Sequence, residues 1–223
     1  MKKNKVDYIL LFATLMLAIF GIIMIYSASF VWAEYKFHDQ FKFVKAQSIF
    51  FIIGLVLIFF FSKLDINFLK KKANLILFCC FILLLLVLIP GIGTIRNGSR
   101  SWFGIGGLGI QPSEFSKIGL IIYVSKYLSN NNKLMKNIKK GVFPILLIIG
   151  IFFALIMLEP DFGTAMVITL TLIVIIFTSG VKISFFTNIG LIGILGIVLL
   201  IIIAPYRMAR IVSFLNPWSD PLG

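Results

Sequence analysis

The stretch that decides how this chain folds is NGSRSWFGIGGLGIQPSEFSK, residues 97–117. It interrupts a sequence that is otherwise mostly Ile, Leu, Val and Phe. Its first half is too rich in glycine to form a spanning helix, because each Gly in a helix interior costs about 1 kcal/mol relative to Ala. Its second half differs, since Pro112 suits the first turn of a helix that begins near Gln111. The stretch therefore predicts a polar loop followed by a new helix.

Two charged residues lie at the start of that predicted helix. Glu114 and Lys117 are three residues apart, so they occupy one face of the helix, one turn apart. We predict that they form an ion pair buried inside the membrane, where ionisable residues are functional by default. The simpler alternative for residues 97–117 is an interfacial loop whose Trp and Arg anchor the chain at the membrane surface.

The composition predicts an all-α, polytopic membrane helix bundle. Hydrophobic residues make up 60% of the chain, and the mean hydropathy is +1.08. A soluble domain of this length cannot bury so many apolar runs of spanning length. The formal net charge is +13, but the basic residues lie in short loops between the apolar runs. That is the positive-inside pattern of membrane proteins, so we predict no nucleic-acid partner.

Seven apolar segments predict seven membrane-spanning helices within one integral membrane domain, residues 1–223. The expected spans are 8–28, 46–62, 73–89, 111–128, 142–158, 164–179 and 183–204. We interpret the first as a retained helix, because it is longer than the apolar region of a signal peptide and more spans follow it. Residues 31–45 are predicted as an interfacial loop and residues 63–72 as a basic loop. The tail, residues 205–223, is amphipathic and is also predicted to be interfacial.

The distribution of basic residues predicts an orientation in the membrane. With the N-terminus in the cytoplasm, 13 of the 21 basic residues lie in inside loops and 7 in outside loops. This bias favours a cytoplasmic N-terminus in a multi-pass protein of the bacterial cytoplasmic membrane. The glycine-rich stretch, the turn at residues 159–161 and all four arginines then face outward. The planar fork of arginine suits bidentate recognition of phosphate or carboxylate.

Three separated motifs resemble the SEDS family of bacterial FtsW, RodA and SpoVE proteins. They are NGSRSWFGIGGLGIQPSEFSK, the turn EPDFGTA at residues 159–165, and the ending YRMARIVSFLNPWSDPLG at residues 206–223. Their order and spacing agree with the family, and the ending is more similar to the FtsW and SpoVE branch than to RodA. The resemblance implies a peptidoglycan glycosyltransferase of cell division that polymerises lipid II on the outer face of the membrane. It implies a class B penicillin-binding protein and other division proteins as partners.

The resemblance also implies ten spans, of which this chain holds the first seven. In the family, the aspartate proposed as catalytic lies beyond the Asp220-Pro221-Leu222-Gly223 sequence at which this chain stops. No residue of this chain matches that aspartate. We therefore expect synthesis to require the part of the protein beyond Gly223.

A lipid-linked disaccharide pyrophosphate requires cations near the outer headgroups and a carboxylate that accepts the proton of the attacking hydroxyl. The substrate-binding candidates are Arg96, Arg100, Trp102, Gln111, Ser113, Arg207 and Arg210. Glu159 and Asp161 are candidates for the base, or for ligands of a divalent cation, and no other cofactor or metal site is predicted. Their alternative role is structural, in a turn where Asp161 caps the next helix.

Two other functional classes fit parts of the pattern. A flippase or transporter of lipid-linked cell-wall precursors also needs arginines near a headgroup. It would be expected to have ionisable groups at several depths, whereas Glu114 and Lys117 are the only buried ones here, since Lys126 is counted with the inside loop that follows residues 111–128. A non-catalytic division scaffold needs no carboxylates on its outer face.

Overall fold

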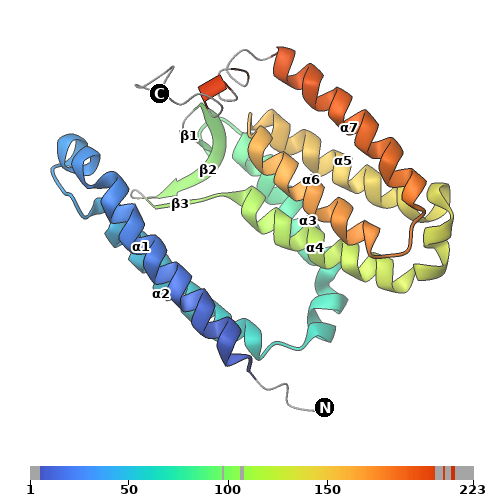
Figure 1. Ribbon diagram of the computed structural model, residues 1–223, viewed down its shortest axis with the longest axis horizontal. Helices are drawn as coiled ribbons and strands as arrows, with labels where there is room; N and C mark the ends of the chain where they lie inside the picture. Colours follow the sequence, from blue (N-terminus) through green and yellow to red (C-terminus); the bar gives the residue numbers. More distant parts are fainter. Residues whose placement is uncertain (1–5, 97, 106–107, 204–207, 209–211, 214–223) are drawn as a thin grey trace. The chain divides into compact units, whose positions relative to one another are not determined.

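The computed structural model of the chain describes residues 6–96, 98–105, 108–203, 208 and 212–213. Within these residues the chain forms seven α-helices and one small sheet (Figure 1). The helices are α1 (Tyr8–Phe37), α2 (Lys42–Ser62), α3 (Ile66–Leu88), α4 (Pro112–Asn130), α5 (Phe143–Leu158), α6 (Phe162–Phe177) and α7 (Ile183–Ile203). The strands are β1 (Thr94–Arg96), β2 (Ser99–Ile105) and β3 (Leu108–Ile110), and the short helices η1 (Asn132–Lys136) and η2 (Ile138–Val142) connect α4 to α5.

The predicted polytopic helical membrane protein is confirmed. Among the described residues, five helical segments are long and apolar enough to cross a membrane: α1, α2, α3, α7 and the continuous segment Ile138–Leu158. The helix α6 is apolar but has only 16 residues. The helix α4 has 19 residues, among them Glu114, Lys117 and Lys126. Each of the seven expected spans corresponds to one of the seven helices.

The predicted loop at residues 31–45 is wrong in its extent. The helix α1 continues to Phe37 and α2 begins at Lys42, so only four residues connect them. His38 ends α1 in the left-handed conformation, with φ of 53°. Aromatic side chains hold this tight connection, because Trp32 stacks on Phe43 with 5.6 Å between the ring centroids. The aromatic residues that suggested an interfacial loop instead extend and join the two helices.

The predicted basic loop at residues 63–72 is also shorter than expected. The helix α3 begins at Ile66, so Lys70, Lys71 and Lys72 lie in its second turn. The Asp65 carboxylate accepts a hydrogen bond from the backbone N–H of Asn67 at 3.0 Å. An aspartate at this position satisfies the free N–H groups of the first turn and starts the helix earlier than the apolar run does.

The chain divides into two compact units. The first contains residues 1–69 and 105–108, and the second contains residues 70–104 and 109–223. In the first unit α1 and α2 pack along each other, and the Asp7 carboxylate caps α1 by accepting hydrogen bonds from Ile9 and Leu10. The single integral membrane domain over residues 1–223 stays a prediction.

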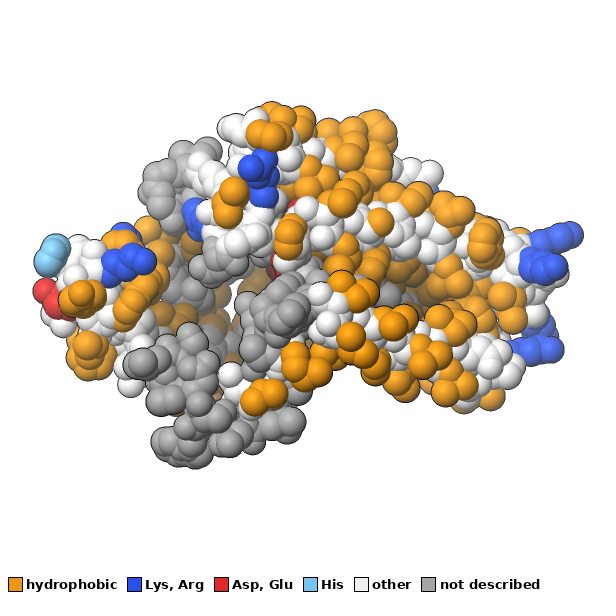
Figure 2. All heavy atoms as spheres, turned by 90° about the horizontal axis from the view of Figure 1, so that it is seen from above, with side chains coloured by type: hydrophobic (Ala, Val, Ile, Leu, Met, Phe, Trp, Pro, Cys, Tyr) orange, Lys and Arg blue, Asp and Glu red, His pale blue; other side chains and the backbone are white. Residues whose placement is uncertain are grey.

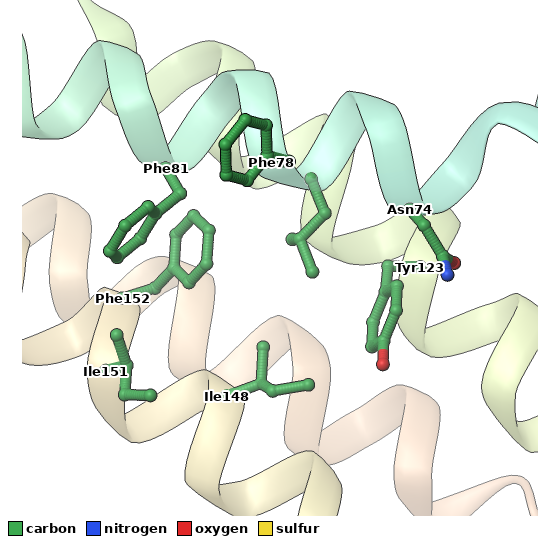
Figure 3. Close-up of a pocket in the computed structure, with 8 residues that line it drawn as sticks. Asn74, Phe78, Phe81, Tyr123, Ile148, Ile151 and Phe152 are labelled. Carbon is green, nitrogen blue, oxygen red and sulfur yellow. The ribbon is translucent and has the colours of Figure 1, made fainter.

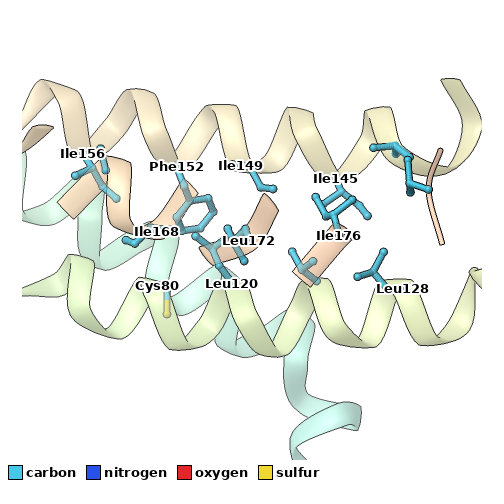
Figure 4. Packing of buried hydrophobic residues seen from close by; sticks show 14 of the residues in the cluster. Cys80, Leu120, Leu128, Ile145, Ile149, Phe152, Ile156, Ile168, Leu172 and Ile176 are labelled. Carbon is cyan, nitrogen blue, oxygen red and sulfur yellow. The ribbon is translucent and has the colours of Figure 1, made fainter. Parts of the chain in front are cut away.

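The second unit contains the buried core, where α4 packs against α5 and α6 (Figure 4). Figure 4 shows the core side chains of these helices directed toward one another, with a helical spacing of three or four residues. Gly119 allows close packing of α4 on α3, since a Cβ atom there would lie 2.8 Å from the Cys80 Sγ atom. Hydrophobic side chains also cover the outer surfaces of the helices, and basic side chains gather where α4 connects to α5 (Figure 2).

The glycine-rich stretch forms a three-stranded sheet with the order β1-β2-β3. The strands β1 and β2 are antiparallel, with Thr94 opposite Trp102 and Arg96 opposite Ser99. The expectation that this stretch is not a spanning helix is confirmed. The sequence did not predict the strands, because its glycines obscure the alternation by which a strand is recognised.

Candidate functional site

The turn between α5 and α6 places two carboxylates in different environments. The Asp161 side chain caps α6, where it accepts hydrogen bonds from the Thr164 backbone N–H at 3.1 Å and from the Thr164 hydroxyl at 2.7 Å. It also accepts a hydrogen bond from the Gln111 side-chain amide at 2.7 Å. The structure therefore shows Asp161 as the cap of α6, which was the structural alternative for this residue. Its role as a catalytic base stays a prediction.

Glu159 is fully buried, and neither of its carboxyl oxygens has a hydrogen-bond partner among the described residues. Burial disfavours the charged form and, together with repulsion from the Asp161 carboxylate, raises the pKa of Glu159 to about 8. The acid is thus mainly neutral at pH 7. A neutral carboxyl group can donate a proton but cannot accept one as a base, so Glu159 in this geometry is suited to proton donation.

The glycine-rich stretch is held against this turn by two contacts. The Ser99 hydroxyl donates a hydrogen bond to the backbone carbonyl of Glu159, and it lies 2.9 Å from the hydroxyl of the buried Ser101. The hydrogen bond from Gln111 to Asp161 is the second contact. These bonds join segments that are 60 and 50 residues apart in the sequence. The sheet that carries the candidate arginines is thereby fixed to the pair of carboxylates.

Arg96 and Trp102 lie together on the sheet. The Arg96 guanidinium carbon is 5.0 Å from the centroid of the Trp102 ring, which is the geometry of a cation–π contact. The glycines around them make this arrangement possible. A Cβ atom at Gly109 would lie 2.5 Å from the Arg96 Nη1 atom, and one at Gly104 would lie 3.4 Å from Nη2. The glycine cluster thus provides space for an arginine over an aromatic ring.

Arg100 is packed along its apolar stem. A Cβ atom added at Gly93 would lie 3.0 Å from the Arg100 Cγ atom and 1.8 Å from the Val87 carbonyl oxygen. Gly93 is therefore required for the close approach of this strand to the end of α3. Among the described residues no hydrogen bond or ion pair joins Arg100 to Glu159 or Asp161.

The predicted pair of Glu114 and Lys117 forms, with 2.7 Å between Lys117 Nζ and Glu114 Oε2. The protein does not bury it, since 54% of the Glu114 side chain and 30% of the Lys117 side chain are exposed. The pair lies in the first turns of α4, because that helix begins at Pro112. The position of this pair inside the membrane stays a prediction.

The remaining candidates differ in accessibility. Ser113 is fully buried, and its hydroxyl has no hydrogen-bond partner among the described residues. The Gln111 side-chain amide donates its hydrogen bond to Asp161. Arg207 and Arg210 lie outside the described residues. No group of three His, Cys, Asp or Glu side chains comes together in the described part of the chain, so the divalent cation stays a prediction.

Sequence reasoning missed Ser99 and Thr164, which make the connecting hydrogen bonds. A signal was present for Thr164, since an aspartate three residues before a threonine at the start of an apolar run is a capping pattern. No such signal existed for Ser99, because its partner is the backbone carbonyl of a residue 60 positions away.

Comparisons with known proteins relate the whole chain to one group. The model of the cell cycle protein family FtsW, RodA and SpoVE matches residues 8–223. Stage V sporulation protein E of Bacillus subtilis (strain 168) is 48% identical over 222 residues, which cover 100% of this chain and 61% of that protein. The probable peptidoglycan glycosyltransferase FtsW of Geobacter sp. (strain M18) is 39% identical over 215 residues, which cover 96% of this chain and 59% of that protein.

Solved structures agree with this relationship. A chain from a peptidoglycan synthase complex that coordinates polymerization and crosslinking has a TM-score of 0.63 and 28% identity, and the match covers 92% of this chain and 60% of that chain. The rod shape determining protein RodA of Thermus thermophilus has a TM-score of 0.62 and 28% identity, with 82% and 58% covered. The chain thus spans about 60% of the length of these relatives. It belongs to the FtsW, RodA and SpoVE family.

Proposed function

We propose that this chain is part of a peptidoglycan glycosyltransferase that polymerises lipid II at the outer face of the bacterial cytoplasmic membrane. The observation that carries the proposal is the attachment of the sheet, with Arg96, Arg100 and Trp102, to the turn at Glu159 and Asp161. Cations and carboxylates are thereby combined at one end of a helical membrane protein. Relatives that are 39% and 36% identical are named probable peptidoglycan glycosyltransferases.

The arginines would bind the pyrophosphate of the lipid-linked sugar donor. Fixed cations stabilise the negative charge that develops on a leaving pyrophosphate, and they do so most strongly where water is excluded. Trp102, with Arg96 over its ring, offers an apolar wall for a sugar. Asp161 is the candidate base in this part of the protein, and the neutral Glu159 can hold or return a proton beside it.

We also propose that the N-terminus is cytoplasmic and that a class B penicillin-binding protein is the partner. The excess of lysines in the predicted inside loops supports the orientation. The similarity to a chain of a peptidoglycan synthase complex that coordinates polymerization and crosslinking supports the partner, because crosslinking is the complementary reaction.

A chimera provides the test. Residues 1–223 would replace the matched 61% of the Bacillus subtilis relative, and the chimera would be reconstituted in vesicles with lipid II. Glycan polymer and transbilayer movement of lipid II would be scored separately. We expect polymer formation. Lipid movement without polymer would favour a flippase, and neither activity in a folded chimera would favour a scaffold.

Substitutions in the same chimera test the site. Arg100→Ala and Trp102→Ala should each reduce polymer formation more than tenfold while membrane levels stay within about twofold. Trp102→Ala removes the cation–π contact with Arg96, which contributes only about 0.5–1 kcal/mol, and the Arg100 side chain makes no hydrogen bond or ion pair among the described residues. Lys136→Ala, in the connection between α4 and α5, is the matched control and should retain full activity. Equal polymer formation by all three variants would show that the sheet does not take part in the reaction.

A further inference from the structure

A second feature lies away from these carboxylates, in a groove of about 260 Å³ between α3, α4 and α5 (Figure 3). Phe81 and Phe152 lie at one end, and Asn74 and Tyr123 lie at the other. Tyr123 is 12 residues after Gln111 in the sequence, which is about 18 Å along the axis of α4. The groove is therefore distinct from the site at Asp161.

The end of the groove at Asn74 is polar and basic. The Lys126 Nζ atom donates a hydrogen bond to the Asn74 side-chain oxygen at 2.8 Å. Lys126 makes no ion pair among the described residues. Tyr123 is half-buried, and its hydroxyl makes no hydrogen bond within the described part of the chain. A cation and a hydroxyl donor are thus available where the apolar lining ends.

The charge around this end is not balanced by acids. Between residues 66 and 158 the sequence contains one acidic residue, Glu114, which pairs with Lys117. The other lysines of that segment are Lys70, Lys71, Lys72, Lys126, Lys133, Lys136, Lys139 and Lys140. All of them lie near the end where α3 begins and where α4 is connected to α5. Such an excess of lysine is complementary to an anionic surface.

We propose that this groove binds an anionic glycerophospholipid of the inner leaflet, with one acyl chain along the apolar wall and the phosphate against Lys126 and Tyr123. Asn74 to Phe81 span about 10 Å of helix, which is enough for roughly half of an extended chain. The groove of about 260 Å³ is lined by apolar side chains between Leu77 and Phe152, along which a hydrocarbon chain can lie.

The choice of a phospholipid follows from the position of the lysines. The proposed orientation places this end at the cytoplasmic face, where anionic phospholipids are attracted by basic residues between spans. The proposed sugar substrate acts at the opposite face. The proposal rests on the groove, its charges and the proposed orientation, and it does not depend on glycosyltransferase activity.

Photo-crosslinking tests the acyl chain. The 223-residue chain would carry p-benzoylphenylalanine in place of Phe78, which lines the groove and is 61% exposed. The matched control replaces Leu75, which is on the same helix and 55% exposed but does not line the groove. In vesicles of phosphatidylglycerol and phosphatidylcholine, mass spectrometry should find phosphatidylglycerol enriched at position 78 and present at its bulk proportion at position 75.

The headgroup contact is tested by native mass spectrometry of the same chain. Lys126→Gln should lower the preference for phosphatidylglycerol over phosphatidylcholine roughly fivefold, the effect of one lysine at a membrane surface. Lys126→Arg should retain the preference, and Lys136→Gln should change it less than twofold. Equal labelling of both lipids at position 78 would overturn the proposal. A cross-link there to protein or to an isoprenoid lipid would overturn it too, as would equal effects of Lys126→Gln and Lys136→Gln.

Discussion

At the residue scale, the turn between α5 and α6 shows how two carboxylates of one motif acquire different chemistry. Asp161 accepts three hydrogen bonds, one from Gln111 and two from Thr164. Glu159 is buried without a partner for its carboxyl oxygens among the described residues, which favours its neutral form. Such a buried acid lowers the stability of the protein whenever the pH favours its ionisation.

The first prediction concerns the pH dependence of stability. The pKa of Glu159 is about 8 in the folded chain against 4.5 for an ordinary glutamate, so the folded state binds the extra proton between these values. The contribution of this proton to the free energy of unfolding is fully present below about pH 4.5. It is lost as the pH rises to 8, at about 1.4 kcal/mol per pH unit. Glu159→Gln should remove this slope and raise the unfolding temperature above pH 6. Thermal unfolding in detergent from pH 5 to 9 measures it, and parallel curves for both proteins would contradict it.

At the element scale, the effect of removing one charge of the ion pair of α4 depends on what surrounds the pair. A buried pair costs about 3–5 kcal/mol when one partner is removed, whereas an exposed pair contributes about 0–1 kcal/mol. Glu114 is 54% exposed in the first turn of α4, which the proposed orientation places at the outer face, so Glu114→Ala should leave the amount of protein in the membrane near normal. The double variant Glu114→Gln, Lys117→Met should have the same level. Quantitative immunoblotting is the measurement, and a lost Glu114→Ala protein rescued by the double variant would show that its surroundings bury the pair.

The contact between α3 and α4 depends on the absence of a side chain at one position. Gly119→Ala would place its Cβ atom 2.8 Å from Cys80 Sγ, and overpacking of this kind typically costs about 1–3 kcal/mol. Gly150 in α5 is the matched control, because a Cβ atom there meets nothing within 4 Å. Gly150→Ala should instead stabilise the helix by up to about 1 kcal/mol.

Thermal unfolding in detergent would separate the two glycine variants. Cys80→Ala combined with Gly119→Ala should recover part of the loss, since the smaller side chain leaves space for the new Cβ atom. A Gly119→Ala protein as stable as Gly150→Ala would show that α3 and α4 separate easily.

At the scale of the whole molecule, the orientation can be tested by labelling. Single cysteines would be placed at Ile95 and Asn137 in a chain without Cys79 and Cys80. Ile95 is chosen because it is 62% exposed on β1. Ser99, by contrast, is half-buried and its hydroxyl is hydrogen-bonded to the Glu159 carbonyl. An impermeant maleimide on intact cells should label position 95 and not position 137. The opposite result would place the lysine-rich connection outside and overturn the proposed site and the lipid groove together.

The sequence by itself determined the class of the protein and the position of its helices. Apolar runs of spanning length require a membrane, and this requirement depends on local composition alone. Pro112 marks the start of α4 and Pro90 follows the end of α3, because proline acts on the backbone next to it. The motifs also indicated the family. Helix ends set by Asp65 and by the aromatic residues near His38 were missed, since capping and packing extended those helices beyond the apolar runs.

Only the tertiary structure decided which polar residues act together. Ser99 reaches the carbonyl of Glu159 because α4, α5 and α6 pack side by side and bring distant segments to one end. Burial raises the pKa of Glu159, whereas Glu114 lies exposed on the protein surface beside Lys117. Local pattern cannot specify these properties, because the energy of a polar group depends on what surrounds it, and its surroundings come from remote parts of the chain.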